Sequence, residues 1–88
     1  MKTEFLKQFY KDIDRIPLQS VRKDIKDSII NVEEALLLRD IINLKKLTGY
    51  KNAYRIKIGN YRIGVYIEHS IVEFARVLHR KDIYRVFP

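Results

Sequence analysis

Residues 54–67 read YRIKIGNYRIGVYI, and this stretch gives the strongest indication of the fold. On both sides of Gly59-Asn60, apolar side chains alternate with polar or charged ones, which is the period of a half-buried β-strand. The Gly59-Asn60 pair suits a two-residue hairpin turn, because glycine supplies the positive φ that such turns need. The stretch therefore predicts a β-hairpin. Its expected cross-strand pairs are Ile58 with Tyr61, Lys57 with Arg62 and Arg55 with Gly64.

The chain before the hairpin has the period of helices. Apolar residues fall at helical spacing from Leu6 to Ile13, and Pro17 interrupts this first helix. A second helix should follow, with one apolar stripe made of Val21, Ile25, Ile29, Val32 and Leu36. Short strands are expected at residues 2–5 and from Ile71 to about Leu78. Residues 37–52 show no clear period.

Together these elements predict one α+β domain over residues 1–88. Its order is β-α-α-β-β-β, a small antiparallel sheet with two N-terminal helices packed on one face. The sheet face that meets the helices should carry the apolar set Tyr54, Ile56, Ile58, Tyr61, Ile63, Val65 and Ile67. The opposite face should carry Arg55, Lys57 and Arg62, and Gly64 is expected to leave that face open.

The composition excludes several classes of site. The chain has no cysteine, so disulfides and thiolate metal sites are not available. Its two histidines, His69 and His79, are too few for an ordinary zinc site, and we expect no metal and no cofactor. No apolar run approaches the roughly 20 residues that span a bilayer, and the first residues lack the apolar stretch of a signal peptide. We therefore expect a cytoplasmic protein with no membrane partner.

The formal charge of +7 lies entirely in the second half of the chain. Residues 1–44 hold eight basic and eight acidic side chains, whereas residues 45–88 hold ten basic and three acidic ones. From Ile41 to Ile67 there are six basic residues and no acidic one. A stretch of one sign indicates a polyanionic partner, and nucleic acid is favoured over membrane lipid or an acidic protein.

The basic side chains fit a particular chemistry, the cutting of RNA without a metal. That reaction needs a base for the ribose 2′-hydroxyl, an acid for the departing 5′-oxygen and cations for the charge that builds on phosphorus. Arginine suits the last role through its planar fork, and aromatic rings stack on unpaired bases. The candidates for these roles are Arg55, Lys57, Arg62, Arg80 and Tyr84. Charge and spacing by themselves support only a phosphate-binding surface.

Three motifs carry a family resemblance. Residues 54–63 closely resemble the central hairpin of RelE/ParE superfamily toxins. Residues 78–84, LHRKDIY, resemble the ending of those toxins, in which His-Arg is followed by a short spacer and a tyrosine. Residues 46–49, KLTG, resemble the KL-x-G that often precedes the hairpin. Each motif is weak alone, but in this order and spacing they are together specific, and they favour the RelE-like branch.

The resemblance implies the toxin of a type II toxin–antitoxin system. RelE-like members enter the ribosomal A site and cleave the mRNA there as metal-independent endoribonucleases, also called mRNA interferases. The implied catalytic residues are Lys57 as the base, Arg62 and Arg80 as acid or phosphate clamp, and Tyr84 as a stacking or orienting residue. The resemblance implies Arg55 as a substrate-binding residue, and Lys46, Lys51, Lys81 and, in second rank, His79 are further expected substrate-binding residues.

The resemblance also implies partners, and it leaves alternatives. The partners are a cognate antitoxin and mRNA on the ribosome, and the toxin–antitoxin complex would bind operator DNA through the antitoxin. ParE-like members share the fold but act on DNA gyrase without cutting RNA. A nucleic-acid-binding module without catalysis is the other alternative. Retention of Lys57, Arg62, Arg80 and Tyr84 favours the RNA-cutting branch.

Overall fold

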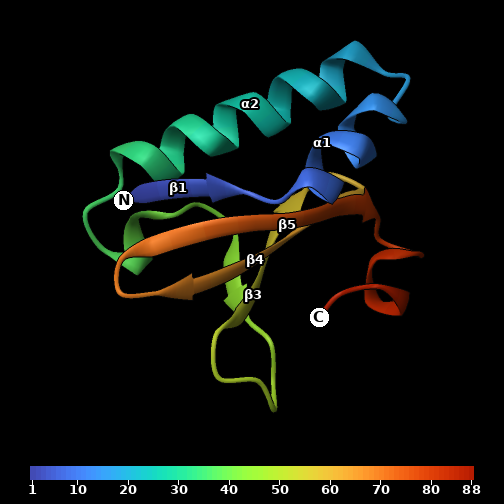
Figure 1. Ribbon diagram of the computed structural model, residues 1–88. Helices are drawn as coiled ribbons and strands as arrows, with labels where there is room; N and C mark the ends of the chain where they lie inside the picture. The colour runs from blue at the N-terminus through green and yellow to red at the C-terminus, as the bar shows by residue number, and fades with distance from the viewer.

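Two helices cross one face of a five-stranded sheet in the computed structural model, which describes residues 1–88. The helices and the sheet form two layers (Figure 1). The strand order in the sheet is β1-β5-β4-β3-β2. The elements are β1 (Lys2–Phe5), α1 (Lys7–Asp14), α2 (Gln19–Glu34), the 3₁₀ turn η1 (Leu38–Asp40), β2 (Leu44–Lys46), β3 (Ala53–Ile58), β4 (Tyr61–Glu68), β5 (Ile71–His79) and the 3₁₀ turn η2 (Ile83–Arg85).

The predicted hairpin is confirmed in its turn and its register. Strands β3 and β4 are antiparallel, and Ile58 pairs with Tyr61, Lys57 with Arg62 and Arg55 with Gly64. Gly59 has a φ of 55°, in the left-handed region that this turn requires. Since paired residues point to the same face, Arg55, Lys57 and Arg62 lie on one side of the sheet.

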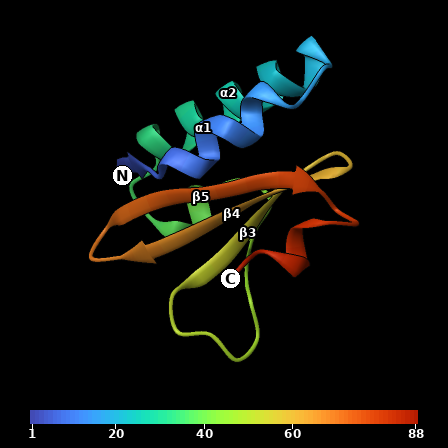
Figure 2. The ribbon, with the colours of Figure 1, turned by 45° about the vertical axis from the view of Figure 1, so that its right-hand side comes forward.

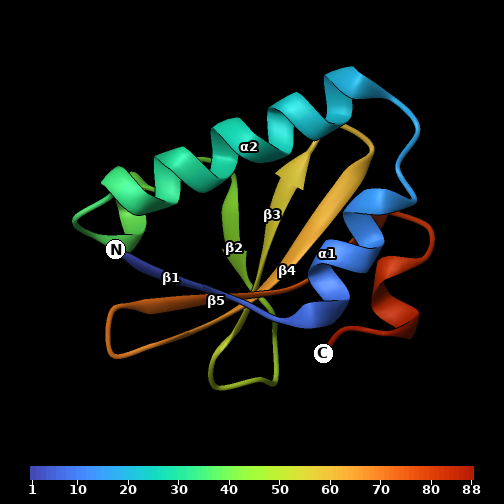
Figure 3. The same ribbon diagram turned by 45° about the horizontal axis from the view of Figure 1, so that its top comes forward.

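The predicted α+β class is confirmed, with two differences in the sheet. The edge strand β2 lies within residues 37–52, which show no clear strand period, and it pairs antiparallel with β3. Strand β1 pairs parallel with β5, so the sheet is mixed rather than purely antiparallel. Figure 3 shows β1 and β5 side by side, with β2 at the far side of the sheet. The β1–β5 pairing joins residues that are remote in sequence, and β2 is a strand of only three residues, so local periodicity encodes neither of them.

The main core lies between the helices and the sheet. It contains Phe9 from α1, Ile25 and Val32 from α2, and Ile56 and Ile63 from the hairpin, all at most 1% exposed. Leu36 is an exception to the predicted apolar stripe, because α2 ends at Glu34 and this side chain is 87% exposed. No helix combines the length and the apolar content needed to cross a membrane.

A buried ion pair fixes α1 to β5. The Asp12 carboxylate is 4% exposed and accepts hydrogen bonds from Arg76 Nε at 2.8 Å and from the Val77 backbone N–H at 3.1 Å. Strand β1 pairs only with residues 71–74 of β5, so Asp12 occupies the edge that β1 leaves uncovered. Every buried side-chain nitrogen and oxygen in the chain has a hydrogen-bond partner.

The sheet face opposite the helices is partly covered by the C-terminal segment. This segment lies on the other side of the sheet from α1 and α2 (Figure 2). Ile83 and Phe87 pack on Ala53 and Ala75 in a second, smaller apolar cluster. The expectation that Gly64 leaves this face open is wrong, because a Cβ at Gly64 would lie 2.5 Å from the Phe87 ring. The missing side chain provides the space into which Phe87 packs.

Candidate functional site

Basic side chains from four segments surround one pocket on the face that carries Arg55 and Arg62. The pocket has a volume of about 670 Å³ and is lined by Lys45, Lys46, Leu47, Thr48, Arg55, Arg62, Arg80, Lys81 and Tyr84. Six of these nine residues are Lys or Arg, and none is acidic. We call it the cationic pocket.

Backbone carbonyls hold the two arginines of the hairpin in place. Arg62 donates from Nη1 to the carbonyl oxygens of Gly59 at 2.8 Å and Tyr61 at 2.9 Å. Arg55 donates from Nη1 to the carbonyl oxygen of Asn43 at 2.9 Å. Each guanidinium carries five N–H donors, so further donors stay free for a ligand. The two forks are therefore oriented before any ligand binds, which lowers the entropy that binding would cost.

The segment after β5 adds the remaining cations and an aromatic ring. The backbone N–H of Arg80 donates to the carbonyl oxygen of Asn60 at 2.7 Å, which ties this segment to the hairpin turn. Tyr84 is 55% exposed, and it lies on η2 directly after the buried Ile83. Burial of Ile83 and Phe87 thus fixes the turn that presents Tyr84 to the pocket.

The pocket cations have no acidic partners. The chain contains three ion pairs, Lys23–Asp27, Arg76–Asp12 and Arg85–Asp82, and none of them includes a pocket residue. At the first of these pairs, which lies on α2, the hydrogen bond to Asp27 raises the pKa of Lys23. Like charges that stand close together without counter-charges favour a polyanionic ligand.

Six of the nine residues predicted as site residues line the pocket, namely Lys46, Arg55, Arg62, Arg80, Lys81 and Tyr84. The other three do not line it. Lys57 is exposed and sits directly across the strand pair from Arg62, beside the pocket. Lys51 lies in the loop between β2 and β3.

His79 faces the other side of the sheet. Its ring lies 5.7 Å from the ring of Tyr61, edge to face, and its Nδ1 accepts a hydrogen bond from the Lys81 backbone N–H at 3.2 Å. A β-bulge causes this orientation. Gly64 pairs with Arg76 and Val65 with Phe74, so Ala75 is an extra residue that reverses the alternation in the rest of β5.

Lys45 is a pocket residue that sequence reasoning missed. It pairs with Arg55 across β2 and β3, and therefore points to the same sheet face. The signal for it was the pair Lys45-Lys46 in a segment without acidic residues. Without a predicted strand there, the side on which Lys45 would lie could not be assigned.

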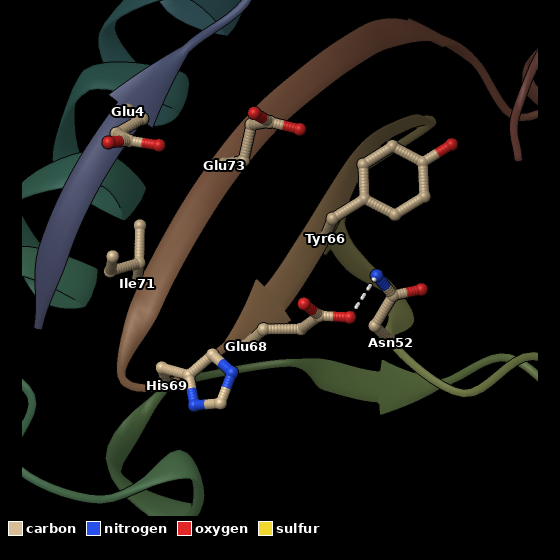
Figure 4. A pocket seen from close by; sticks show the side chains of 7 residues that line it. All are labelled: Glu4, Asn52, Tyr66, Glu68, His69, Ile71 and Glu73. Carbon is tan, nitrogen blue, oxygen red and sulfur yellow. Dashed lines mark hydrogen bonds between the residues drawn. The ribbon is translucent and has the colours of Figure 1, made fainter.

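A second pocket, of about 430 Å³, lies at the far end of β4 and β5 and has the opposite charge. Figure 4 shows its lining residues, among them Glu4, Glu68 and Glu73, with the Asn52 side chain donating to Glu68 at 2.9 Å. Nowhere in the chain do three His, Asp or Glu side chains form a group that could hold a metal ion. Arg62 and Arg80 of the basic pocket thus lie at the opposite end of β4 and β5 from Glu68, whereas the segment between β2 and β3 borders both pockets.

Comparisons with known proteins agree on one family. Residues 3–84 match the family described as "ParE toxin of type II toxin-antitoxin system, parDE". Toxin RelE3 of Methanocaldococcus jannaschii is 45% identical over 89 residues, covering all of both chains. The fold also resembles a crystal structure of the RelB-RelE antitoxin-toxin complex from Methanococcus jannaschii. That match has a TM-score of 0.80, is 43% identical and covers 97% of this chain and 99% of the other.

A more distant structure supports the fold alone. The archaeal RelE-RelB complex from Pyrococcus horikoshii matches with a TM-score of 0.72 at 18% identity, over 90% of this chain and 93% of the other.

Proposed function

The chain belongs to the RelE/ParE family of type II toxin–antitoxin toxins, and from this membership we propose that it is an endoribonuclease that cuts mRNA in the ribosomal A site. The cationic pocket carries this proposal. It gathers six Lys and Arg side chains without an acid and adds one exposed aromatic ring. The cations would bind the phosphates of the RNA, and the ring would stack on an unpaired base. Single-stranded mRNA in the ribosome presents both phosphates and unpaired bases.

The proposed reaction is a transfer within the RNA strand. The 2′-oxygen loses its proton to a base and attacks the adjacent phosphorus, and the 5′-oxygen leaves with a proton from an acid. The products are a 2′,3′-cyclic phosphate and a free 5′-hydroxyl. The protein's contribution is proton transfer and stabilisation of the charge on the phosphoryl oxygens.

The hairpin and the segment after β5 supply residues for these roles. Lys57 is the proposed base, because it stands on the same sheet face as Arg62 and is exposed. Arg62 and Arg80 are the proposed phosphate clamp or acid. The guanidinium of Arg62 is already oriented by two carbonyls, as a preorganised clamp requires. Arg55, Lys46 and Lys81 would bind neighbouring phosphates, and Lys51 those that lie further along the strand.

The ring of Tyr84 is the proposed stacking platform. It is exposed at the pocket, and η2 is anchored by buried side chains on both sides. His79 does not belong to the proposed site, because its ring is engaged with Tyr61 on the opposite face of the sheet.

We also propose that a RelB-type antitoxin neutralises the chain. The relative from Methanococcus jannaschii was crystallised as a RelB-RelE complex, at 43% identity to this chain. An antitoxin with an acidic segment would satisfy the unpaired cations of the pocket. The complex would bind operator DNA through the antitoxin, and both proteins would act in the cytoplasm, where ribosomes are.

A second candidate function is ParE-like action on DNA gyrase without RNA cleavage. The matching family description names ParE toxins, and this observation favours the candidate. A third candidate function is nucleic-acid binding by the same pocket without catalysis.

Induced expression with mapping of transcript ends separates these functions. The proposed activity gives cuts within translated codons, and these cuts disappear with Arg80→Ala. The matched control is Arg39→Ala, an exposed arginine on η1 outside the pocket. DNA damage without RNA cuts would support gyrase poisoning, and growth without either effect would leave only a binding role.

A further inference from the structure

Two of the six tyrosines in the chain have exposed rings that pair with no other aromatic ring. Tyr54 and Tyr61 pack on the main core, Tyr66 packs on the second cluster, and the Tyr10 ring lies 5.8 Å from that of Phe5. Tyr50 and Tyr84, by contrast, are 51% and 55% exposed, pair with no other aromatic ring and belong to neither apolar cluster. A large aromatic side chain usually gains stability by burial, but single exposed rings are common, so the surroundings of these two rings decide whether they have a role.

Tyr50 lies in the loop of residues 47–52, which we call the β2–β3 loop. This loop projects from the sheet, away from the helices, and is drawn in yellow-green in Figures 1 and 3. The Leu47 backbone N–H donates to the Ala53 carbonyl at 2.9 Å and closes the base of the loop. Gly49, with a φ of 86°, turns the chain just before Tyr50. The loop is therefore a defined turn that carries an exposed ring.

The β2–β3 loop and η2 rest on the same apolar cluster. Leu47, at the base of the loop, packs on the cluster that contains Ile83 and Phe87. Tyr84 is the next residue after Ile83. Two exposed rings are thus presented by segments that share one anchor. The cationic pocket adjoins both segments, since Thr48 of the loop and Tyr84 of η2 line it.

The positive charge beside Tyr50 also favours binding of a nucleic acid. Lys51 follows it directly, and no acidic residue occurs from Ile41 to Ile67. The loop also borders the acidic pocket, because the Asn52 side chain donates to Glu68 at 2.9 Å, and Lys51 is the cation between that contact and Tyr50. Single-strand binders combine cations for the backbone with aromatic rings for successive bases, and Tyr50 with Lys51 supplies one of each.

We propose that Tyr50 is a second base-stacking residue, which extends the site from the cationic pocket along a single-stranded RNA. This inference rests on the proposed function, because it assumes that the pocket binds RNA. Tyr84 stacks on one base at the pocket, Tyr50 stacks on another base that reaches the β2–β3 loop, and Lys51 contacts a phosphate beside it. Stacking of one base on an aromatic ring changes affinity by about 5- to 150-fold.

The test uses a single-stranded 12-mer that the protein cannot cut. Methylation of every 2′-oxygen removes the attacking hydroxyl, and 2-aminopurine at one position at a time reports stacking by its fluorescence. Tyr50→Leu removes the ring, Tyr50→Phe keeps it, and Tyr10→Leu is the control at an exposed tyrosine on α1. We expect Tyr50→Leu to weaken binding by about 5- to 150-fold and to abolish quenching at one 2-aminopurine position. Tyr50→Phe and Tyr10→Leu should bind like the unchanged chain.

Three results would overturn the proposal, and each has a different meaning. Equal affinity and quenching for Tyr50→Leu and the unchanged chain would remove Tyr50 from the site while leaving the proposed function intact. Weaker capture of an antitoxin by Tyr50→Leu, with unchanged binding of the oligonucleotide, would assign the ring to a protein interface. Failure of the unchanged chain to bind the oligonucleotide or ribosome-held mRNA would reject the proposed function, and the inference with it.

Discussion

Two exposed side chains of this toxin, Arg80 and Lys57, are expected to contribute to activity but not to stability. Arg80 and Lys57 are exposed, and neither side chain takes part in an ion pair. Lys57 stands directly opposite Arg62, and like charges at such a pair are unfavourable. Removing either charge should therefore relieve repulsion instead of breaking a structural contact.

We expect Arg80→Ala and Lys57→Ala each to lower ribosome-dependent cleavage by about 10²- to 10⁴-fold, the range for groups that transfer a proton or stabilise developing charge. The free energy of unfolding should change by less than about 0.5 kcal/mol, as at other surface sites. The measurements are single-turnover cleavage of mRNA on programmed ribosomes and chemical denaturation of each variant. Near-normal cleavage by both variants would mean that the pocket binds RNA without catalysing its cleavage.

Ile63→Ala is expected to lower stability without affecting catalysis. Ile63 is fully buried in the main core, 0% exposed, and its loss leaves a cavity between the sheet and the helices. We expect a loss of about 2–5 kcal/mol in the free energy of unfolding, with cleavage per folded molecule unchanged. If Arg80→Ala or Lys57→Ala unfolds as easily as Ile63→Ala, those two residues are structural.

At the scale of elements, the contact between β4 and the C-terminal segment orients the aromatic part of the site. Gly64 has no side chain, and Phe87 occupies the space above it. Phe87 and Ile83 together hold η2 against the sheet, and η2 carries Tyr84. The geometry of the pocket thus depends on a glycine that makes no contact with a ligand.

We expect Gly64→Ala to displace Phe87, because the new Cβ would lie 2.5 Å from the ring. The cost should be about 1–3 kcal/mol, as for other overpacked sites, and cleavage should fall with it. Thermal unfolding and cleavage measure the two effects. Gly64→Ala combined with Phe87→Ala gives the control, since the smaller side chain removes the clash and should recover part of the stability. A single variant as stable as the unchanged chain would show that the segment shifts without cost.

At the scale of the whole molecule, the distribution of charge predicts catalysis that needs no metal. The pocket offers six cations and no carboxylate, and such a set repels a divalent ion. We expect cleavage to continue at an unchanged rate when EDTA is added up to the level at which ribosomes stay intact by sedimentation. A loss of cleavage below that level, restored by one particular metal, would contradict this prediction.

The same uncompensated charge predicts a tight partner. An antitoxin that covers the pocket should copurify with the toxin from the native operon, and it should raise the melting temperature because it binds only the folded state. High salt should weaken the complex if its contacts are largely ionic. Arg80→Ala should lower the affinity more than Arg39→Ala does. A toxin that is harmless alone and recovers no second protein would argue against this partner.

The hairpin, its register, the polarity of its faces and six of the pocket residues could be predicted from the sequence alone. Alternation with a period of two is local, so Arg55, Lys57 and Arg62 could be assigned to one face from neighbours alone. The two helices could be predicted from their apolar periodicity in the same way. The absence of acidic residues from Ile41 to Ile67 is likewise visible in the sequence.

The way in which segments outside the hairpin complete the site became clear only from the folded structure. It paired β2 with β3 and so brought Lys45 into the pocket, and it packed Phe87 over Gly64. It also placed a bulge in β5, which turned His79 away from the cations. One inserted residue reverses every later side chain on a strand, and such an insertion is favoured by packing against neighbouring elements and not by local sequence.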